Sequence, residues 1–231
     1  MKSKIKVDNR LKDIASLIPK CNTVADIGTD HGYLAIYLIQ ENIAQKVIAS
    51  DVAVGPLSQA KANIKKYNLD DKITTILSDG LDKIDGLADC IVMAGMGANL
   101  IISILEKRKV DYPCFILEAN LNTNLIRKYV SSNNYQIVDE KVSFVAKKYY
   151  EIIKIEKGHQ ELSELEIKYG PINLKKMEPN FINKLNNSLT TYENILVDFK
   201  GNDLEKARIN KEIDEIKNIL KERRCWLWNN H

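Results

Sequence analysis

Four side chains that can accept hydrogen bonds or face a positive charge stand where apolar runs of the sequence end. Asp30 follows Gly28 in a glycine-containing turn, Asp51 closes a second run, Asp79 a third and Asn120 a fifth. Short, continuously apolar runs are typical of strands in a parallel sheet covered on both faces. Because ligands bind at the carboxyl ends of such strands, we expect these side chains to gather at one binding site.

The turn that contains Asp30 has the sequence V-A-D-I-G-T-D-H-G-Y-L, residues 24–34. Gly28 and Gly32 lack a Cβ, so backbone can approach a ligand, and the free N–H groups of the following helix point toward it. The dinucleotide fingerprint G-x-G-x-x-G would place a glycine where Asp30 stands, and a carboxylate there would repel a pyrophosphate. A cationic ligand suits it, such as S-adenosylmethionine with its sulfonium and ammonium groups. An ordinary tight turn is the alternative.

Strands and helices are predicted to alternate around this turn. Apolar residues at helical spacing from Leu11 to Ile18 predict a short first helix. Apolar runs predict strands at 23–27, 47–50, 73–77, 90–93 and 114–117, then an antiparallel hairpin at 135–145 and 148–156. Helical patterns fall between them, one to about Gln40 and others at 56–67, 99–107 and 122–132. The predicted fold class is α/β, with a mostly parallel seven-stranded sheet covered on both faces.

The chain changes character near Gly158, and we place the domain boundary there, between residues 1–157 and 158–231. Apolar residues then recur at intervals of three and four in two segments separated by a turn at 200–203. They are Phe181, Leu185, Leu189, Tyr192, Leu196 and Phe199, followed by Ile209, Ile213, Ile216, Leu220 and Leu227. This spacing predicts an antiparallel, coiled-coil-like helical hairpin. Its role stays open between simple packing, RNA contact and dimer formation.

Composition is that of an ordinary globular protein. Apolar residues make up 45% of the 231 residues and charged residues 28%, and the formal net charge of +3 permits a nucleic-acid partner without requiring one. The cysteines, Cys21, Cys90, Cys114 and Cys225, form no C-x-x-C pair, so we expect reduced thiols and no metal site. No apolar run approaches the roughly 20 residues of a membrane span, and the first residues lead into no signal-type segment, so we expect a cytoplasmic protein.

Five stretches taken together resemble a known family. They are D-I-G-T-D-H-G-Y-L from Asp26, Asp51 with Gly55-Pro56, S-D-G-L from Ser78, A-G-M-G from Ala94 and Y-Y-E-I-I from Tyr149. The set resembles the bacterial tRNA methyltransferases that act on N1 of adenine 22, along essentially the whole chain. The resemblance implies a Rossmann-like class I methyltransferase domain, a helical coiled-coil-like domain after it, S-adenosyl-L-methionine as cofactor and tRNA as partner. We expect a monomer.

Side-chain positions and the resemblance together give the predicted site residues. Those for the cofactor are Asp26, Gly28, Thr29, Asp51, Val52, Ser78, Asp79, Gly80, Ala94, Gly95 and Met96, with Asp51 on the ribose hydroxyls and Asp79 on the adenine amine. The catalytic residues are Asp30, implied by the resemblance, and Asn120, which could hydrogen-bond the base. RNA contacts are predicted at Lys4, Lys6, Arg10, His31, Tyr33 and Lys147. For His31 a capping role, and for Tyr33 a core role, are alternatives.

The sequence departs from the family at the end of the fifth strand. Many relatives read Q-P-N there, whereas this chain reads Glu118-Ala119-Asn120, so only the asparagine matches. The pocket for the target base is the part of the site that this difference affects.

The chemistry of the base gives a mechanism for the implied reaction. N1 of neutral adenine has an available lone pair, so attack on the sulfonium methyl needs alignment but no prior deprotonation. The product gains positive charge unless the exocyclic amine loses a proton, and we assign to Asp30 the stabilisation of that charge or the removal of that proton. The adenine must be unpaired and turned out of its stack.

Three alternatives differ in substrate or in class. The first is a class I methyltransferase acting on another RNA site or on a small molecule. The second is a non-catalytic RNA-binding protein. The third, a nicotinamide-dependent dehydrogenase, is disfavoured by Asp30 in the glycine turn.

Overall fold

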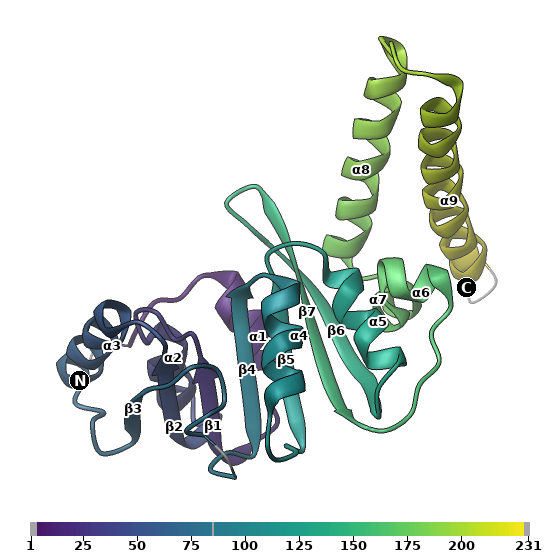
Figure 1. Cartoon of the computed structure of the whole chain (residues 1–231). Helices are drawn as coiled ribbons and strands as arrows, with labels where there is room; N and C mark the ends of the chain where they lie inside the picture. The colour runs from purple at the N-terminus through teal and green to yellow at the C-terminus, as the bar shows by residue number, and fades with distance from the viewer. Residues whose placement is uncertain (1–3, 85, 229–231) are drawn as a thin grey trace. The chain divides into compact units, whose positions relative to one another are not determined.

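Seven strands form one sheet in the computed structural model, which describes residues 4–84 and 86–228, with side chains as far as Glu222 (Figure 1). The strands are β1 (Cys21–Ile27), β2 (Ala44–Asp51), β3 (Ile73–Leu77), β4 (Cys90–Met96), β5 (Cys114–Ala119), β6 (Tyr135–Val145) and β7 (Lys148–Lys157). Their order is β3-β2-β1-β4-β5-β7-β6. The pairs among β1 to β5 are parallel, and β7 is antiparallel to both of its neighbours. The predicted mostly parallel sheet with a closing hairpin is confirmed.

Helices cover both faces of this sheet. They are α1 (Asn9–Leu17), α2 (Tyr33–Gln40), α3 (Val54–Lys66), α4 (Ala98–Lys107) and α5 (Thr123–Ser131). One buried apolar cluster joins α1, α2 and α3 to the sheet, and a second joins α4 and α5 to it. Val24 of β1 belongs to the first cluster and its neighbour Ala25 to the second. Because successive strand residues point to opposite faces, the two clusters lie on opposite sides of the sheet.

The predicted and observed elements differ mainly at strand ends. β1 begins at Cys21 and β2 at Ala44, earlier than predicted, because these two residues pair in the sheet register. Asn22 and Lys46, near the starts of these two strands, are exposed. The first residues of each strand therefore form no apolar run that would predict them. β4 continues beyond the predicted 90–93 to its end after a shift of register with β5.

The strand order reverses between β1 and β4, and this point positions the site. β2 and β3 lie on one side of β1, whereas β4 and β5 lie on the other. The connections that leave β1 and β4 at their carboxyl ends therefore run to helices on opposite faces of the sheet. Such a reversal leaves a crevice outside the strand ends, where ligands of open α/β sheets bind.

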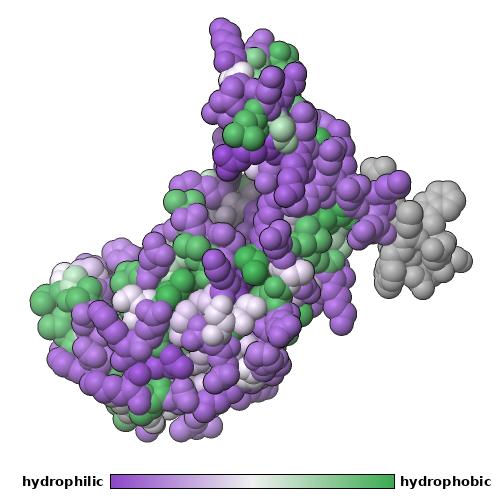
Figure 2. Space-filling model, turned by 45° about the vertical axis from the view of Figure 1, so that its right-hand side comes forward, coloured by the Kyte–Doolittle hydropathy of each residue, from purple (hydrophilic) through white to green (hydrophobic). Residues whose placement is uncertain are grey.

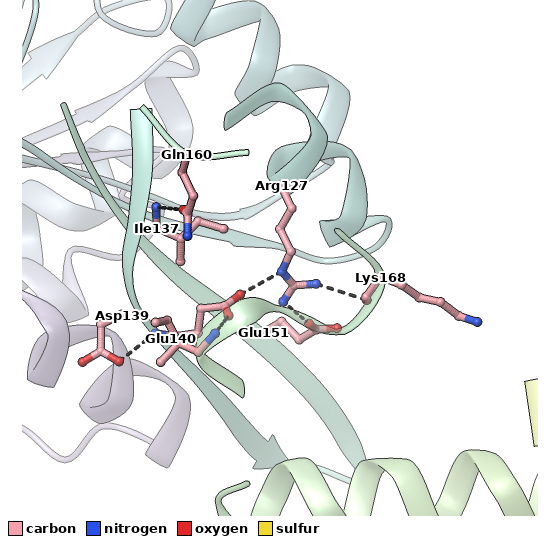
Figure 3. A network of polar contacts seen from close by, with 8 residues as sticks. Arg127, Ile137, Asp139, Glu140, Glu151, Gln160 and Lys168 are labelled. Carbon is pink, nitrogen blue, oxygen red and sulfur yellow. Dashed lines mark hydrogen bonds and ion pairs between the residues drawn. The ribbon is translucent and has the colours of Figure 1, made fainter. Parts of the chain in front are cut away.

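A buried ion-pair network ties the segment after β7 to the sheet (Figure 3). Arg127 of α5 donates from Nε to Glu140 Oε1 of β6 at 2.8 Å and also pairs with Glu151 of β7. Its Nη1 donates to the carbonyl of Lys168 at 3.3 Å, in α6 (Glu164–Tyr169). Glu140 Oε2 accepts from the backbone N–H of Ile172 at 2.9 Å. The side chains of Arg127 and Glu140 are fully buried, and α5, β6, β7, α6 and the backbone of Ile172 all meet at this charged centre.

The chain forms two compact units, residues 1–172 and 173–231. α6 therefore belongs to the first unit, although its residues follow the predicted boundary at 157. Gly170, which ends α6, has φ +93°, and a Cβ there would collide with the Glu140 carboxylate. Only glycine suits both the backbone angle and the close approach of that side chain. α7 (Pro171–Lys176) follows directly.

The second unit contains a pair of long helices, α8 (Pro179–Val197) and α9 (Asp203–Trp228) (Figure 1). Their buried side chains are Phe181, Leu185, Ile213, Ile216 and Ile219. Lys217 Nζ lies 2.8 Å from Glu193 Oε1 and links the two helices. The predicted C-terminal helical region is confirmed, while the side chains of Cys225 and Leu227 lie outside the described residues.

Hydrophilic side chains dominate the face of this hairpin that is drawn in Figure 2, with a small hydrophobic group near its tip. Ile195, Val197 and Leu204, at the end of α8 and the start of α9, are exposed. In the part of the chain that the structure describes, no helix is both long and apolar enough to cross a bilayer.

Candidate active site

A cavity of about 580 Å³ lies at the carboxyl edge of the sheet, where β1 and β4 end. The β1–α2 turn, the end of β4, the end of β5, the start of α1 and the β6–β7 turn all contribute to its lining. It brings together ten of the predicted site residues: Asp26, Gly28, Thr29, Ala94, Gly95, Asp30, Asn120, Arg10, His31 and Tyr33. Residues predicted for three different roles thus surround one cavity.

The glycine turn is fixed by the neighbouring strand β2. The backbone N–H groups of Gly28 and Thr29 both donate to the carbonyl of Ser50, at 2.8 and 2.9 Å. Gly28 has φ +75°, and a Cβ built on it would lie 2.5 Å from Met96 Cε. Gly32 has φ +71°, and its Cβ would lie 3.2 Å from Ala60 Cβ. Both glycines are therefore favoured by their positive φ, and Gly32 also by its close approach to Ala60.

Asp26 is the buried carboxylate of the cavity. It is 5% exposed and accepts from Thr29 Oγ1 at 2.7 Å. Burial raises the pKa of Asp26 to about 6, because desolvation outweighs the hydrogen bond from Thr29, and Asp51 nearby acts in the same direction as burial. A positive charge in the cavity would stabilise the ionised form of this carboxyl group.

The remaining predicted cofactor residues follow the adjoining strand ends and lie outside the cavity lining. Asp51 at the end of β2 accepts from the backbone N–H of Ala53 at 2.9 Å and of Asp30 at 3.4 Å. Its carbonyl accepts from the N–H of Ser78 at 3.0 Å. Val52 is exposed beside it, Asp79 and Gly80 line a smaller hollow against α4, and Met96 packs over Gly28. These residues extend the edge of the sheet from β1 to β3.

Asp30, His31 and Tyr33 stand at the mouth of the cavity. Asp30 is 68% exposed with φ +50°, and its Oδ2 lies 3.5 Å from His31 Nε2. The rings of His31 and Tyr33 stack at 5.4 Å between centroids. Tyr33 is 44% exposed, so it is not a core residue, and no side chain caps the start of α2. Both rings are open to a flat partner.

Glu118, the residue at which the sequence departs from its relatives, is buried behind the cavity. It is 0% exposed, and burial raises the pKa of its carboxyl group, against the opposing charge of Arg10. Its Oε2 accepts from Arg10 Nη1 at 2.8 Å and from the backbone N–H of Gly95 at 3.0 Å. Arg10 also lies over the ring of Tyr150, with Cζ 5.3 Å from the centroid. Arg10 therefore faces inward, although it was predicted as an RNA contact.

The predicted lysines lie outside the cavity lining. Lys4 is exposed and its Nζ lies 2.9 Å from Glu41 Oε1. Lys6 is exposed on the segment before α1, and Lys147 is exposed in the β6–β7 turn with φ +64°. Within the described residues, no cluster of three or more histidine, cysteine or acidic side chains is placed to hold a metal ion.

Comparison with known proteins identifies the family to which this chain belongs. Residues 7–153 match the family model described as "Methyltransferase domain". The tRNA (adenine(22)-N(1))-methyltransferase of Bacillus subtilis (strain 168) is 34% identical over 163 residues, which cover 69% of this chain and 68% of that protein. The chain belongs to the tRNA (adenine-22-N1)-methyltransferase family.

Solved structures of similar proteins extend the likeness beyond the sheet of this methyltransferase family member. Sp1610 of Streptococcus pneumoniae is 30% identical, with a TM-score of 0.86 over 93% of this chain and 100% of that one. A second structure of Sp1610, in complex with S-adenosyl-L-methionine, gives a TM-score of 0.83 at 29% identity and the same coverage. M. capricolum TrmK, in complex with S-adenosyl-homocysteine, is 30% identical with a TM-score of 0.78 over 93% and 98% of the two chains.

Proposed function

We propose that this protein methylates N1 of adenine 22 in tRNA, with S-adenosyl-L-methionine as the methyl donor. The observation that carries the proposal is the cavity at the β1–β4 reversal, in which a glycine turn, a buried carboxylate and two exposed stacked rings meet. Membership of the family supports the same reaction, since relatives are named for it and bind the cofactor or its product.

We assign the cofactor to the edge formed by β1, β2, β3 and β4. Gly28, Thr29, Ala94 and Gly95 supply backbone at close range, and Asp26 faces the positive charges of the ligand. Along the adjoining strand ends, Asp51 and Val52 take the ribose, and Ser78, Asp79 and Gly80 take the adenine, while Met96 contributes from the end of β4, where it packs over Gly28. This division follows from the order of the strands, because each next strand end lies further from the glycine turn.

The reaction is a single displacement at carbon. The N1 lone pair of adenine forms the new N–C bond while the methyl–sulfur bond breaks, and its electron pair stays on the sulfur of S-adenosyl-homocysteine. The base acquires positive charge. We assign to Asp30 either the stabilisation of that charge or the removal of a proton from the exocyclic amine. Asn120 hydrogen-bonds the base, and alignment of the two reactants supplies much of the remaining acceleration.

The flipped base and its neighbours need a surface beside the cavity. The stacked rings of His31 and Tyr33 are exposed at its mouth and offer a face to a nucleobase. Lys4, Lys6 and Lys147 are exposed and can reach phosphates. We assign Arg10 to the cavity wall, since its guanidinium is paired with Glu118.

We further propose that the helical region predicted at residues 158–231, whose compact part begins at Asn173, forms a coiled-coil-like domain that contributes to tRNA binding, and that the protein is a monomer in the cytoplasm, where its substrate is. The apolar seam between α8 and α9 supports the helical hairpin, and because this seam is satisfied within one chain it also supports the monomer. No step of the reaction calls for a metal ion.

Methyl transfer from labelled S-adenosyl-L-methionine to unmodified tRNA tests the proposal, with product nucleosides identified and a tRNA carrying guanine at position 22 as control. We expect 1-methyladenosine, with no label in the control. Label at another nucleotide would indicate a different RNA site, and cofactor binding without transfer to tRNA would indicate a small-molecule substrate. Absence of cofactor binding would indicate a non-catalytic RNA-binding protein.

A further inference from the structure

The Gly95 peptide in the cavity wall is held from both sides by the end of β5. Its N–H donates to Glu118 Oε2 at 3.0 Å, and its carbonyl accepts from Asn120 Nδ2 at 2.8 Å. The backbone N–H of Asn120 also donates to the carbonyl of Met96 at 2.9 Å. Gly95 has φ +75° where the register between β4 and β5 shifts, a backbone conformation that favours glycine. Two side chains two residues apart, Glu118 near the end of β5 and Asn120 just after it, hold this residue from both sides.

Arg10 completes the support by balancing the buried charge of Glu118. A fully buried carboxylate without a partner would cost several kcal/mol or take up a proton. Arg10 reaches it from the first turn of α1, with 25% of its side chain exposed and its guanidinium against the Tyr150 ring. Its Nη1 would lie 3.7 Å from a Cβ on Gly95. The guanidinium therefore holds the Glu118 carboxylate, which in turn accepts from the Gly95 N–H.

The contact to Gly95 also determines which way the Asn120 amide is turned. A carbonyl oxygen only accepts, so the atom of Asn120 that faces it must be the nitrogen. The amide oxygen, Oδ1, is then left as an acceptor on an exposed side chain that lines the cavity. An acceptor at this place suits an exocyclic amine.

We propose that Glu118 and Arg10 are positioning residues that hold the Gly95 peptide, and through it the Asn120 amide, so that Asn120 Oδ1 accepts a hydrogen bond from the exocyclic amine of the target adenine. The inference rests on the proposed function. Adenine carries the amine next to N1, whereas guanine carries a carbonyl there. The oriented Asn120 Oδ1 accepts from the amine of adenine, whereas with guanine it would face the carbonyl oxygen, which is also an acceptor. This difference gives selectivity for adenine at the reacting edge of the base.

Glu118→Ala and Arg10→Ala each remove one part of this support. Glu118→Gln retains an oxygen that accepts from Gly95 N–H and Arg10, and its NH₂ takes the place of Glu118 Oε1, which has no hydrogen-bond partner among the described residues. Glu156→Gln is a matched control, because Glu156 pairs with Lys154 on β7 at 3.1 Å and lies outside the cavity lining. Each variant is measured for kcat and KM with tRNA and for the Kd of S-adenosyl-L-methionine.

We expect both alanine variants to lower kcat by about 10- to 100-fold, because a misplaced reactant of order 1 Å costs on that scale. The Kd for the cofactor should change by less than about threefold, and Glu118→Gln should keep kcat within about threefold of wild type. The preference for adenine over purine, which lacks the amine, at position 22 should fall in Glu118→Ala and persist in Glu156→Gln. The fall in base preference distinguishes positioning from a general loss of packing, because a packing defect would not change the selectivity for the amine.

Two results would overturn the inference. One is an unchanged kcat and base preference in Glu118→Ala, and the other is a loss of cofactor affinity that matches the loss of kcat. If Glu118→Ala does not fold, Arg10→Ala and Glu118→Gln carry the same comparison. A wild-type protein that transfers no methyl group to tRNA would refute the proposed function instead, so the two failures are separable.

Discussion

Replacing Arg127 with methionine should lower the free energy of unfolding of the first compact unit by about 3–5 kcal/mol. The guanidinium is fully buried, and its loss leaves Glu140 buried with Glu151 only 12% exposed. Methionine replaces the packing of the aliphatic stem, so most of the loss is the cost of two buried carboxylates that have lost their shared cationic partner. For a unit of this size the melting temperature should fall by roughly 6–20 °C.

Differential scanning calorimetry measures this effect, and the transition of the first unit is identified by its upward shift when S-adenosyl-L-methionine is added. Adding Glu140→Gln and Glu151→Gln to Arg127→Met should recover much of the loss at pH 8. A loss below about 1 kcal/mol, or a triple variant as unstable as the single one, would refute the reasoning.

Three further predictions concern the site. Asp51→Ala should weaken cofactor binding by about tenfold or more, whereas Asp30→Ala should mainly lower kcat, by about 100-fold; equal losses of binding by both would contradict the division of roles. Cofactor affinity, measured by titration calorimetry, should fall as pH drops below about 6, where Asp26 takes up a proton, and Asp26→Asn should abolish that dependence. Because its pKa is raised, Asp26 binds protons more tightly in the folded protein, so without ligand its contribution to stability is lost as pH rises through about 6. Affinity for tRNA should fall about tenfold or more between 50 and 200 mM salt, and a flat response would exclude a phosphate-based footprint.

The regular elements were predictable because their buried faces leave a direct signal. β3 occupies the predicted residues 73–77, and the hairpin of β6 and β7 lies within one residue of its predicted ends. The glycine turn was also predictable from local sequence, because Gly28 and Gly32 are favoured by the backbone conformation of the turn itself. Signals of this kind arise from neighbours in sequence.

The contacts of Glu118 were not predictable, because its partner Arg10 is 108 positions away. The available signal was a glutamate near the end of the run C-F-I-L-E-A, whose six residues are all buried. A charged residue in such a run requires a partner, but the sequence does not say which basic residue supplies it. The sequence therefore groups Arg10 with the basic N-terminal residues that are predicted to contact RNA.

Arg127 was missed for a different reason. On an amphipathic helix an arginine between apolar residues is typical of a solvated position, and α5 also carries a lysine at the next place in the sequence. Glu140 and Glu151, its partners, lie on strands that the prediction placed correctly but did not relate to α5. Only the order of the sheet brings the three together.

The position of β7 between β5 and β6 also constrains how the chain is made. β5 leaves the ribosome with one edge unpaired, and that edge is covered only when residues 148–157 have followed. Its six residues are all buried in the finished sheet, so the nascent chain carries an apolar edge strand of the kind that pairs with other chains. Arg127 is synthesised in the same interval and meets both of its carboxylates only after Glu151 emerges. Slow translation between residues 119 and 148 therefore prolongs the state most exposed to aggregation.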